Sequence, residues 1–169
     1  MLKNKIMPTV ILSSICIVIA LLLSIANLIT APHIEKAQKE KAEEALRVVY
    51  PDAQTFDALD ISKLGLPEVI DEVYRANDGG YVFKSTVSGY KDGLVIMCGV
   101  DPTGKITDSK YIESNETNGA EAKLDGKYKG ASKDTLSVVV ISGSTKTSDG
   151  YRGAIEASLT AFEILTGGK

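Results

Sequence analysis

The chain has 169 residues, of which 44% are hydrophobic and 24% charged. This length suits one ordinary domain with a further segment and excludes two large domains. All 22 acidic residues lie after Ala31, so residues 32–169 carry 17 basic and 22 acidic side chains, a net charge of −5 against −3 for the whole chain. An acidic body without a basic patch argues against nucleic acid as the main partner.

The residues that bind metals and act as nucleophiles are scarce. The chain has two cysteines, Cys16 and Cys98, and one histidine, His33. These are too few for a disulfide framework or a structural zinc site, and they do not favour a Ser-His-Asp triad. We therefore expect no metal site. Cys98 lies in an apolar run and is predicted to be a buried core thiol.

An uncharged segment occupies residues 9–30, between Pro8 and Pro32. Its 22 residues exceed the ~20 that a transmembrane helix needs. We predict a single membrane anchor over residues 1–31, in which Cys16 faces lipid or packs and His33 lies at the membrane edge. A cleaved secretory signal is the alternative, although the apolar core of such a signal usually spans roughly 7–15 residues.

The orientation of the anchor stays open on charge alone. Lys3 and Lys5 precede the segment, while four basic residues follow it within a short distance, and a long domain translocates largely regardless of charge. Residues 32–50 alternate Glu and Lys around apolar positions at helical spacing, which is typical of an exposed helix. We interpret them as a juxtamembrane helical stalk that carries a body of residues 51–169.

The body has the pattern of an α+β domain with a mainly antiparallel sheet and packed helices. Turn sequences at Asn77–Gly80 and Asp101–Gly104 join strand-like runs, because Asn, Asp and Gly tolerate positive φ. Apolar residues at helical spacing then predict a C-terminal helix over Tyr151–Leu165, ended by Gly167 and Gly168. The predicted strands are Val73–Ala76, Tyr81–Val87, Leu94–Val100, Lys105–Glu113 and Leu136–Ile141.

A hydroxyl-rich loop, SGSTKTS, separates the last predicted strand from this helix. A strand, a small loop and a helix N-terminus together suit a phosphate group, since Gly143 allows close backbone approach and the helix dipole favours negative charge. The spacing is not that of a Walker loop. On the residues alone, a polar turn with Ser148 or Asp149 as the helix N-cap explains the same pattern, and the spacing by itself favours this simpler interpretation.

Two segments resemble a known family. SGSTKTS at residues 142–148 resembles the S-G-A-T-x-T-S flavinylation motif of FMN-binding domains, and ETNG at residues 116–119 resembles their E-T-P-G element. The preceding strand-turn-strand and the hairpin VYRANDGGYVF are also similar. Such domains occur in the G subunit of the Rnf-type ion-translocating ferredoxin:NAD oxidoreductase and in the C subunit of the related sodium-pumping NADH:quinone reductase. The resemblance covers residues 9–165, and the short chain favours the G subunit.

The resemblance implies a covalent flavin. In the family, a separate flavin transferase joins FMN through its phosphate to a threonine hydroxyl, which here corresponds to Thr145. Thr147 and Ser144 are the alternative hydroxyls, and Lys146 is either a partner of the phosphate or a solvated lysine. Further residues would shape the phosphate turn or lie along the isoalloxazine ring; they are Ser142 and Gly143 for the turn, and Glu116, Thr117 and Gly119 for the ring.

The chain departs from the family pattern at four positions. Ser144 stands where the motif has Ala, and Val139 stands where an Asp precedes the motif serine by three residues. Asn118 replaces the Pro of E-T-P-G, and Glu121 replaces a Gly that often follows.

The resemblance therefore implies a membrane-anchored electron-transfer subunit that carries covalent FMN and has little activity alone. Its partners would be the other membrane subunits of an Rnf-type complex, the flavin transferase and lipid, with the body on the extracytoplasmic side of the cell membrane. Two alternatives stay open. One is a stand-alone flavinylated extracytoplasmic reductase. The other is a non-redox anchored scaffold in which SGSTKTS only caps a helix.

Overall fold

The computed structural model describes residues 12–24 and 44–167. The chain divides into two compact units, Met1–Lys41 and Ala42–Lys169. Of the first unit, residues 12–24 form an exposed helix that includes Cys16. Among the described residues, no helix is both long and apolar enough to cross a membrane. The predicted span 9–30 extends beyond the described residues at both ends, and His33 lies outside them.

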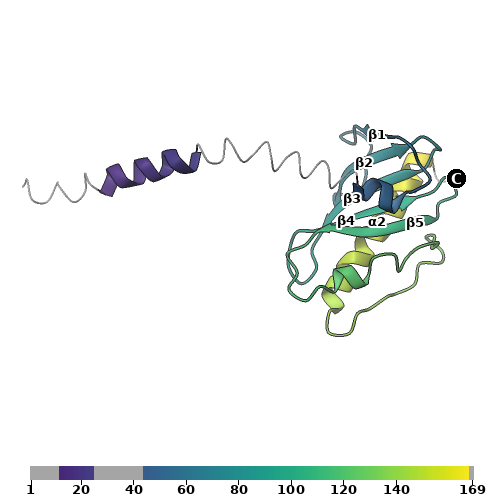
Figure 1. Cartoon of the computed structure of the whole chain (residues 1–169). Helices are drawn as coiled ribbons and strands as arrows, with labels where there is room; N and C mark the ends of the chain where they lie inside the picture. The colour runs from purple at the N-terminus through teal and green to yellow at the C-terminus, as the bar shows by residue number, and fades with distance from the viewer. Residues whose placement is uncertain (1–11, 25–43, 168–169) are drawn as a thin grey trace, which may run out of the picture. The chain divides into compact units, whose positions relative to one another are not determined.

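A five-stranded antiparallel sheet forms the centre of the second unit (Figure 1). Each strand pairs with the next one in the sequence, in the order β1-β2-β3-β4-β5, so no connection crosses the sheet. Tight turns allow this arrangement, because Gly79 and Gly104 both adopt positive φ, at 94° and 82°. The strands are β1 (Phe56–Leu59), β2 (Ile70–Ala76), β3 (Tyr81–Val87), β4 (Leu94–Val100) and β5 (Ile106–Glu113).

The long helix α2 (Thr145–Thr166) covers one face of this sheet. Alternate residues of β4, such as Ile96 and Cys98, point toward it, as the period of a strand requires. They pack with Tyr151, Ile155 and Leu159 of the helix in the larger apolar core. Gly167 ends α2 in the left-handed conformation, with φ 73°, as predicted. The predicted α+β fold with a mainly antiparallel sheet is confirmed.

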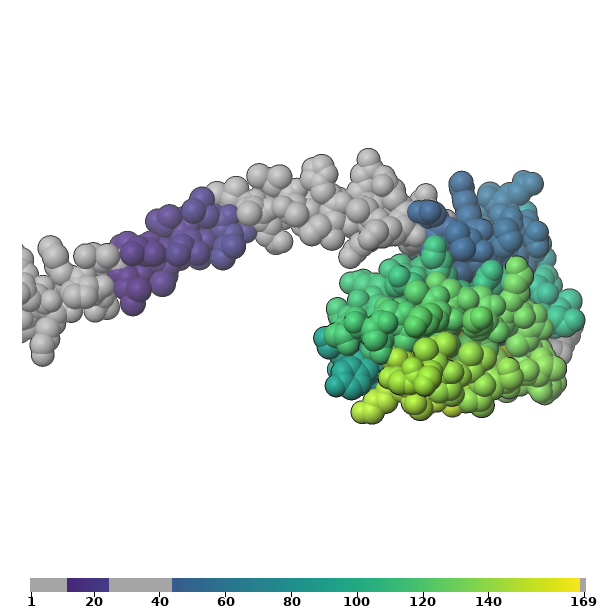
Figure 2. Space-filling model, turned by 60° about the horizontal axis from the view of Figure 1, so that its bottom comes forward, coloured from purple at the N-terminus to yellow at the C-terminus, as the bar shows by residue number. Residues whose placement is uncertain are grey.

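The opposite face of the sheet is covered by residues 44–49, which form a short helix. Leu46, Val49 and Tyr50 are buried there against Val82 and Met97 in a second apolar cluster. The end of the predicted stalk therefore belongs to the body, because its apolar positions cover sheet side chains that would otherwise face water. Residues 32–43 of the stalk lie outside the described residues. Figure 2 shows this blue segment and the yellow-green C-terminal part on opposite sides of the body.

The strand predictions differ from the structure in one missed strand, one strand that does not form and two that start at other residues. Strands β3 and β4 have the predicted bounds, and β2 and β5 differ from theirs only at the first residues, but β1 was not predicted. The strand predicted over Leu136–Ile141 is wrong, since this run pairs with no strand. Leu136, Val139 and Ile141 instead pack against the larger core, while Val138 and Val140 are exposed. The segment is therefore held by the burial of these three side chains on the core, and not by hydrogen bonds to a neighbouring strand.

A carboxylate fastens the loop after β5 to both the sheet and α2. Asp125 Oδ1 accepts hydrogen bonds from the Tyr111 backbone N–H at 2.9 Å and from the Tyr151 hydroxyl at 3.0 Å. Partial burial raises the pKa of Asp125 above its ordinary value, although these two hydrogen bonds oppose the shift. The short helix η1 (Glu121–Lys123) lies in the same loop, just before Asp125.

We expect Asp125→Asn to stabilise the body at neutral pH. A raised folded-state pKa means that the protonated acid stabilises the fold, and this contribution is lost as the pH rises through that pKa. Asparagine keeps the accepting oxygen without the charge. Its gain in unfolding free energy should be largest at pH 7 and shrink toward about pH 4, near the ordinary pKa of Asp. Denaturant unfolding of both full chains, monitored by the near-ultraviolet circular dichroism of their tyrosines, measures the difference in unfolding free energy. A gain that is independent of pH would contradict the prediction.

Candidate functional site

The hydroxyl-rich segment forms the beginning of α2 instead of preceding it. The helix starts at Thr145 with Ser144 as its N-cap, six residues before the predicted Tyr151, and the alternative that Ser148 or Asp149 caps it is wrong. The buried Ser148 hydroxyl accepts from the Ile141 N–H at 3.0 Å and donates to the Ser144 carbonyl at 2.9 Å. Its side chain thus closes the turn before the helix.

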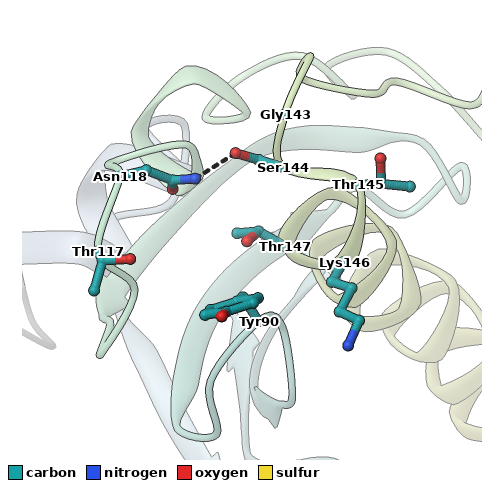
Figure 3. Close-up of a pocket in the computed structure, with 8 residues that line it drawn as sticks. All are labelled: Tyr90, Thr117, Asn118, Gly143, Ser144, Thr145, Lys146 and Thr147. Carbon is teal, nitrogen blue, oxygen red and sulfur yellow. Dashed lines mark hydrogen bonds between the residues drawn. The ribbon is translucent and has the colours of Figure 1, made fainter.

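A cavity of about 520 Å³ opens beside this helix start (Figure 3). Three parts of the chain build its wall: the loop after β3, the loop after β5 and the first turn of α2. Hydroxyl and amide groups dominate the lining, with one aromatic ring and one cation. The lining residues are Tyr90, Thr117, Asn118, Gly143, Ser144, Thr145, Lys146 and Thr147.

Glu116 joins the three walls. Its Oε2 accepts from the Thr147 hydroxyl at 3.0 Å, and its Oε1 accepts from the Lys91 backbone N–H at 3.1 Å. The loop after β3 packs directly on α2 at this point. The contact is so close that a Cβ on Gly150 would overlap the Ser88 carbonyl and lie 3.2 Å from the Gly89 Cα. The carboxylate also lies near the helix N-terminus, where negative charge is favourable.

The three hydroxyls singled out in the sequence differ in exposure. Thr147 is fully buried and donates to Glu116, and Ser144 is 9% exposed with its hydroxyl bonded to Asn118. Thr145 is exposed, and Figure 3 shows its side chain pointing away from the Asn118–Ser144 bond. Of these three hydroxyls, Thr145 therefore offers the accessible one.

The structure places only some of the other residues singled out in the sequence in the cavity lining. Ser142 and Gly143 are exposed in the turn before the helix, and Gly143 has the positive φ of 79° that this turn requires. Thr117 lines the cavity, whereas Gly119, which follows the lining residue Asn118 in the chain, does not. Val139 packs against the larger core.

Two lining residues were missed by the sequence analysis. Tyr90 is 67% exposed, and the Lys146 ammonium lies 6.0 Å from its ring centroid. Asn118 was noted only as a departure from a motif, yet its amide bonds to Ser144. A tyrosine in a loop and an asparagine in a turn are common, so only the folded chain shows that both face the helix start.

The cysteines and acids of the described residues offer no alternative centre. As predicted, Cys98 is buried, and burial raises the pKa of its thiol to about 12, which leaves it protonated and unreactive. Among the residues that the structure describes, no cluster of His, Cys, Asp or Glu could hold a metal ion. An exposed hydroxyl, a cation and a helix start instead suit an anionic group such as a phosphate.

Comparisons with known proteins identify the family. The model of the FMN-binding domain matches residues 89–160, from the loop of Tyr90 into α2. The chain is 33% identical, over 94% of its own length and 84% of the relative's, to the G subunit of the Na⁺-translocating ferredoxin:NAD⁺ oxidoreductase complex of Acetobacterium woodii. The chain belongs to the Rnf-type G-subunit family. It is also 25% identical to the G subunit of the proton-translocating ferredoxin:NAD⁺ oxidoreductase complex of Clostridium ljungdahlii, over 91% and 89% of the two chains.

Membership of the G-subunit family confirms the resemblance seen in the two motifs. Both motifs lie inside the matched domain, and both contribute residues to the cavity. The lining fits FMN in chemical terms: the helix start and Lys146 suit its phosphate, and the Tyr90 ring suits an aromatic ring system.

We expect Gly150→Ala to destabilise the body by about 1–3 kcal/mol, because its methyl group would push the Ser88 carbonyl off the helix. Gly153→Ala is the matched control, since nothing lies within 4 Å of its added Cβ. The control should stabilise the helix by up to about 1 kcal/mol. Denaturant unfolding of both variants measures the two effects, and equal effects would show that the loop does not press on α2.

Proposed function

We propose that the chain is the electron-transfer subunit of an Rnf-type complex and carries FMN bound covalently through its phosphate to Thr145. The observation that carries the proposal is the exposed Thr145 hydroxyl at the start of α2, on the wall of a cavity inside an FMN-binding domain. Flavin supplies the electron chemistry when bound, and the protein supplies orientation and electrostatics. A phosphoester to the chain prevents loss of the cofactor to the medium.

The cavity residues have separate roles in this proposal. Ser142 and Gly143 shape the turn around the phosphate, and Lys146 offsets its charge. Glu116 and Thr117 lie along the isoalloxazine ring together with Gly119, the neighbour of the lining residue Asn118. The bond from Thr147 to Glu116 removes a competing hydroxyl and fixes the floor of the site.

The proposal includes the place of the protein in the cell. The uncharged segment 9–30 anchors the chain in the cell membrane, and the body lies on the extracytoplasmic side. The other membrane subunits of the complex exchange electrons with its flavin, and a flavin transferase attaches the FMN. Support comes from the two relatives, which are named as subunits of ferredoxin:NAD⁺ oxidoreductase complexes.

We expect Thr145→Val to abolish the covalent flavin, because valine has the shape of threonine without the acceptor hydroxyl. The full chain, produced in cells that flavinylate other proteins, is separated on a denaturing gel and viewed under ultraviolet light. Mass spectrometry then maps FMN to the peptide that contains residue 145. Thr160→Val is the matched control, since Thr160 is on the same helix but outside the cavity lining.

The control should keep its fluorescent band. A Thr145→Val band as bright as that of the unmodified chain would overturn the attachment site. A dark, properly folded unmodified chain would overturn the covalent flavin itself and favour the anchored scaffold.

Purification of the full chain from its native membrane tests the assembly. We expect other membrane subunits to co-purify in constant ratio, and a membrane-impermeant thiol reagent to label a cysteine introduced at the exposed Ser137 (Ser137→Cys) from outside intact cells. Cys98 is buried and stays silent, and the chain without the introduced cysteine provides the background. A fluorescent chain that purifies alone would favour the stand-alone reductase, and labelling only after lysis would overturn the orientation.

A further inference from the structure

We infer that Asn118 is a positioning residue that keeps Ser144 from capping α2 and so leaves the N–H groups of the helix start available to the FMN phosphate. The inference rests on the proposed function of the cavity. Asn118 Nδ2 donates to Ser144 Oγ at 2.5 Å, across 26 residues of sequence (Figure 3). This bond connects the loop after β5 to the residue directly before Thr145.

The orientation of the Asn118 amide is fixed. Its Oδ1 accepts from the Ala120 backbone N–H at 3.2 Å, so the NH₂ group is the one that faces Ser144. A flipped amide would place two donors together at Ala120 and lose that bond. The Ser144 hydroxyl therefore serves as the acceptor of a side chain from another part of the fold.

This use of the hydroxyl changes the helix start. A serine N-cap ordinarily accepts a hydrogen bond from the second or third helical N–H, here Lys146 or Thr147. Ser144 makes no such bond, and its backbone angles of φ −139° and ψ 42° lie outside the usual capping geometry. Within the described part of the chain, the N–H groups of Thr145, Lys146 and Thr147 donate to no acceptor.

Thr145, Lys146 and Thr147 all line the cavity, so their uncapped N–H groups lie beside the place proposed for a phosphate. The positive end of the helix dipole adds to their attraction for an anion. If Ser144 capped the helix, its hydroxyl would occupy one of these donors and compete with the ligand.

The test uses the full chain with Thr145→Val, so that flavins bind reversibly and are titrated by fluorescence. Adding Asn118→Ala should release Ser144 to adopt capping backbone angles and cap α2. FMN binding should then weaken by roughly ten- to a hundredfold, the value of one hydrogen bond to a charged group. Riboflavin, which lacks the phosphate, should bind equally well to both chains. Adding Ser144→Ala to Asn118→Ala should restore FMN binding, since alanine cannot cap.

Asn115→Ala is the matched control. Asn115 lies in the same loop and its amide donates to the Asp92 carbonyl, so its loss removes one hydrogen bond without touching Ser144. The ratio of FMN to riboflavin affinity should stay unchanged in this control. An unchanged ratio in Asn118→Ala, or a ratio that Ser144→Ala does not restore, would overturn the inference and leave the proposed function intact.

Hydrogen exchange separates the two claims without flavin. Amide exchange at Lys146 or Thr147 should slow in Asn118→Ala, where Ser144 caps the helix, and return to the faster rate when Ser144→Ala is added. No slowing would overturn the inference. If the folded Thr145→Val chain bound neither flavin, the exchange data alone would decide how Ser144 is held. The proposed function is decided separately, by whether the unmodified chain carries covalent FMN.

Discussion

The architecture of the site depends on the close approach of a backbone loop to the first turns of α2. Because Gly150 has no side chain, the Ser88 carbonyl reaches the helix, and the following residues lie close enough for Glu116 to bond to Lys91 and Thr147 together. Without this contact, Glu116 would no longer hold the three walls of the cavity together through its two hydrogen bonds. One carboxylate and one glycine thus define the geometry of a site whose residues come from distant parts of the chain.

Some hydroxyl groups of the site are bonded to other parts of the protein, and others remain accessible to a ligand. Thr147, Ser144 and Ser148 all direct their hydroxyls to protein partners, and each is buried. Thr145 remains exposed beside them. In a sequence segment rich in similar hydroxyls, selectivity for one acceptor can follow from burial alone. Neighbouring hydroxyls need no chemical difference if the fold gives only one of them access.

Local patterns predicted much of this structure. The hairpin turns, strands β3 and β4 and the C-terminal glycine of α2 follow from short-range sequence chemistry and appear where expected. The errors have a common cause. Leu136–Ile141 has the composition of a strand but no partner in the sheet, and residues 44–50 resemble a solvated helix until the sheet supplies an apolar face. Both depend on tertiary contacts that propensity does not contain.

The candidate site shows the same division. The motifs located Thr145 and Glu116 in the sequence, because their spacing is fixed by backbone turns and a helix start. The bond between Asn118 and Ser144 could not be anticipated, since it joins positions 26 residues apart through side chains common in any turn. Tyr90 was missed for a similar reason, as its importance comes only from the cavity that it faces.

The order of the strands has a consequence for how the protein matures. In a sheet whose neighbours in space are neighbours in sequence, pairing proceeds through short loop closures, which favours rapid assembly. The helix that bears Thr145 comes after all five strands, while the loops that face it come earlier. The site is therefore complete only after this helix docks on the finished sheet. Cofactor attachment at such a site would report on the folding of the whole body, and an enzyme that recognises the assembled site would leave misfolded copies unmarked.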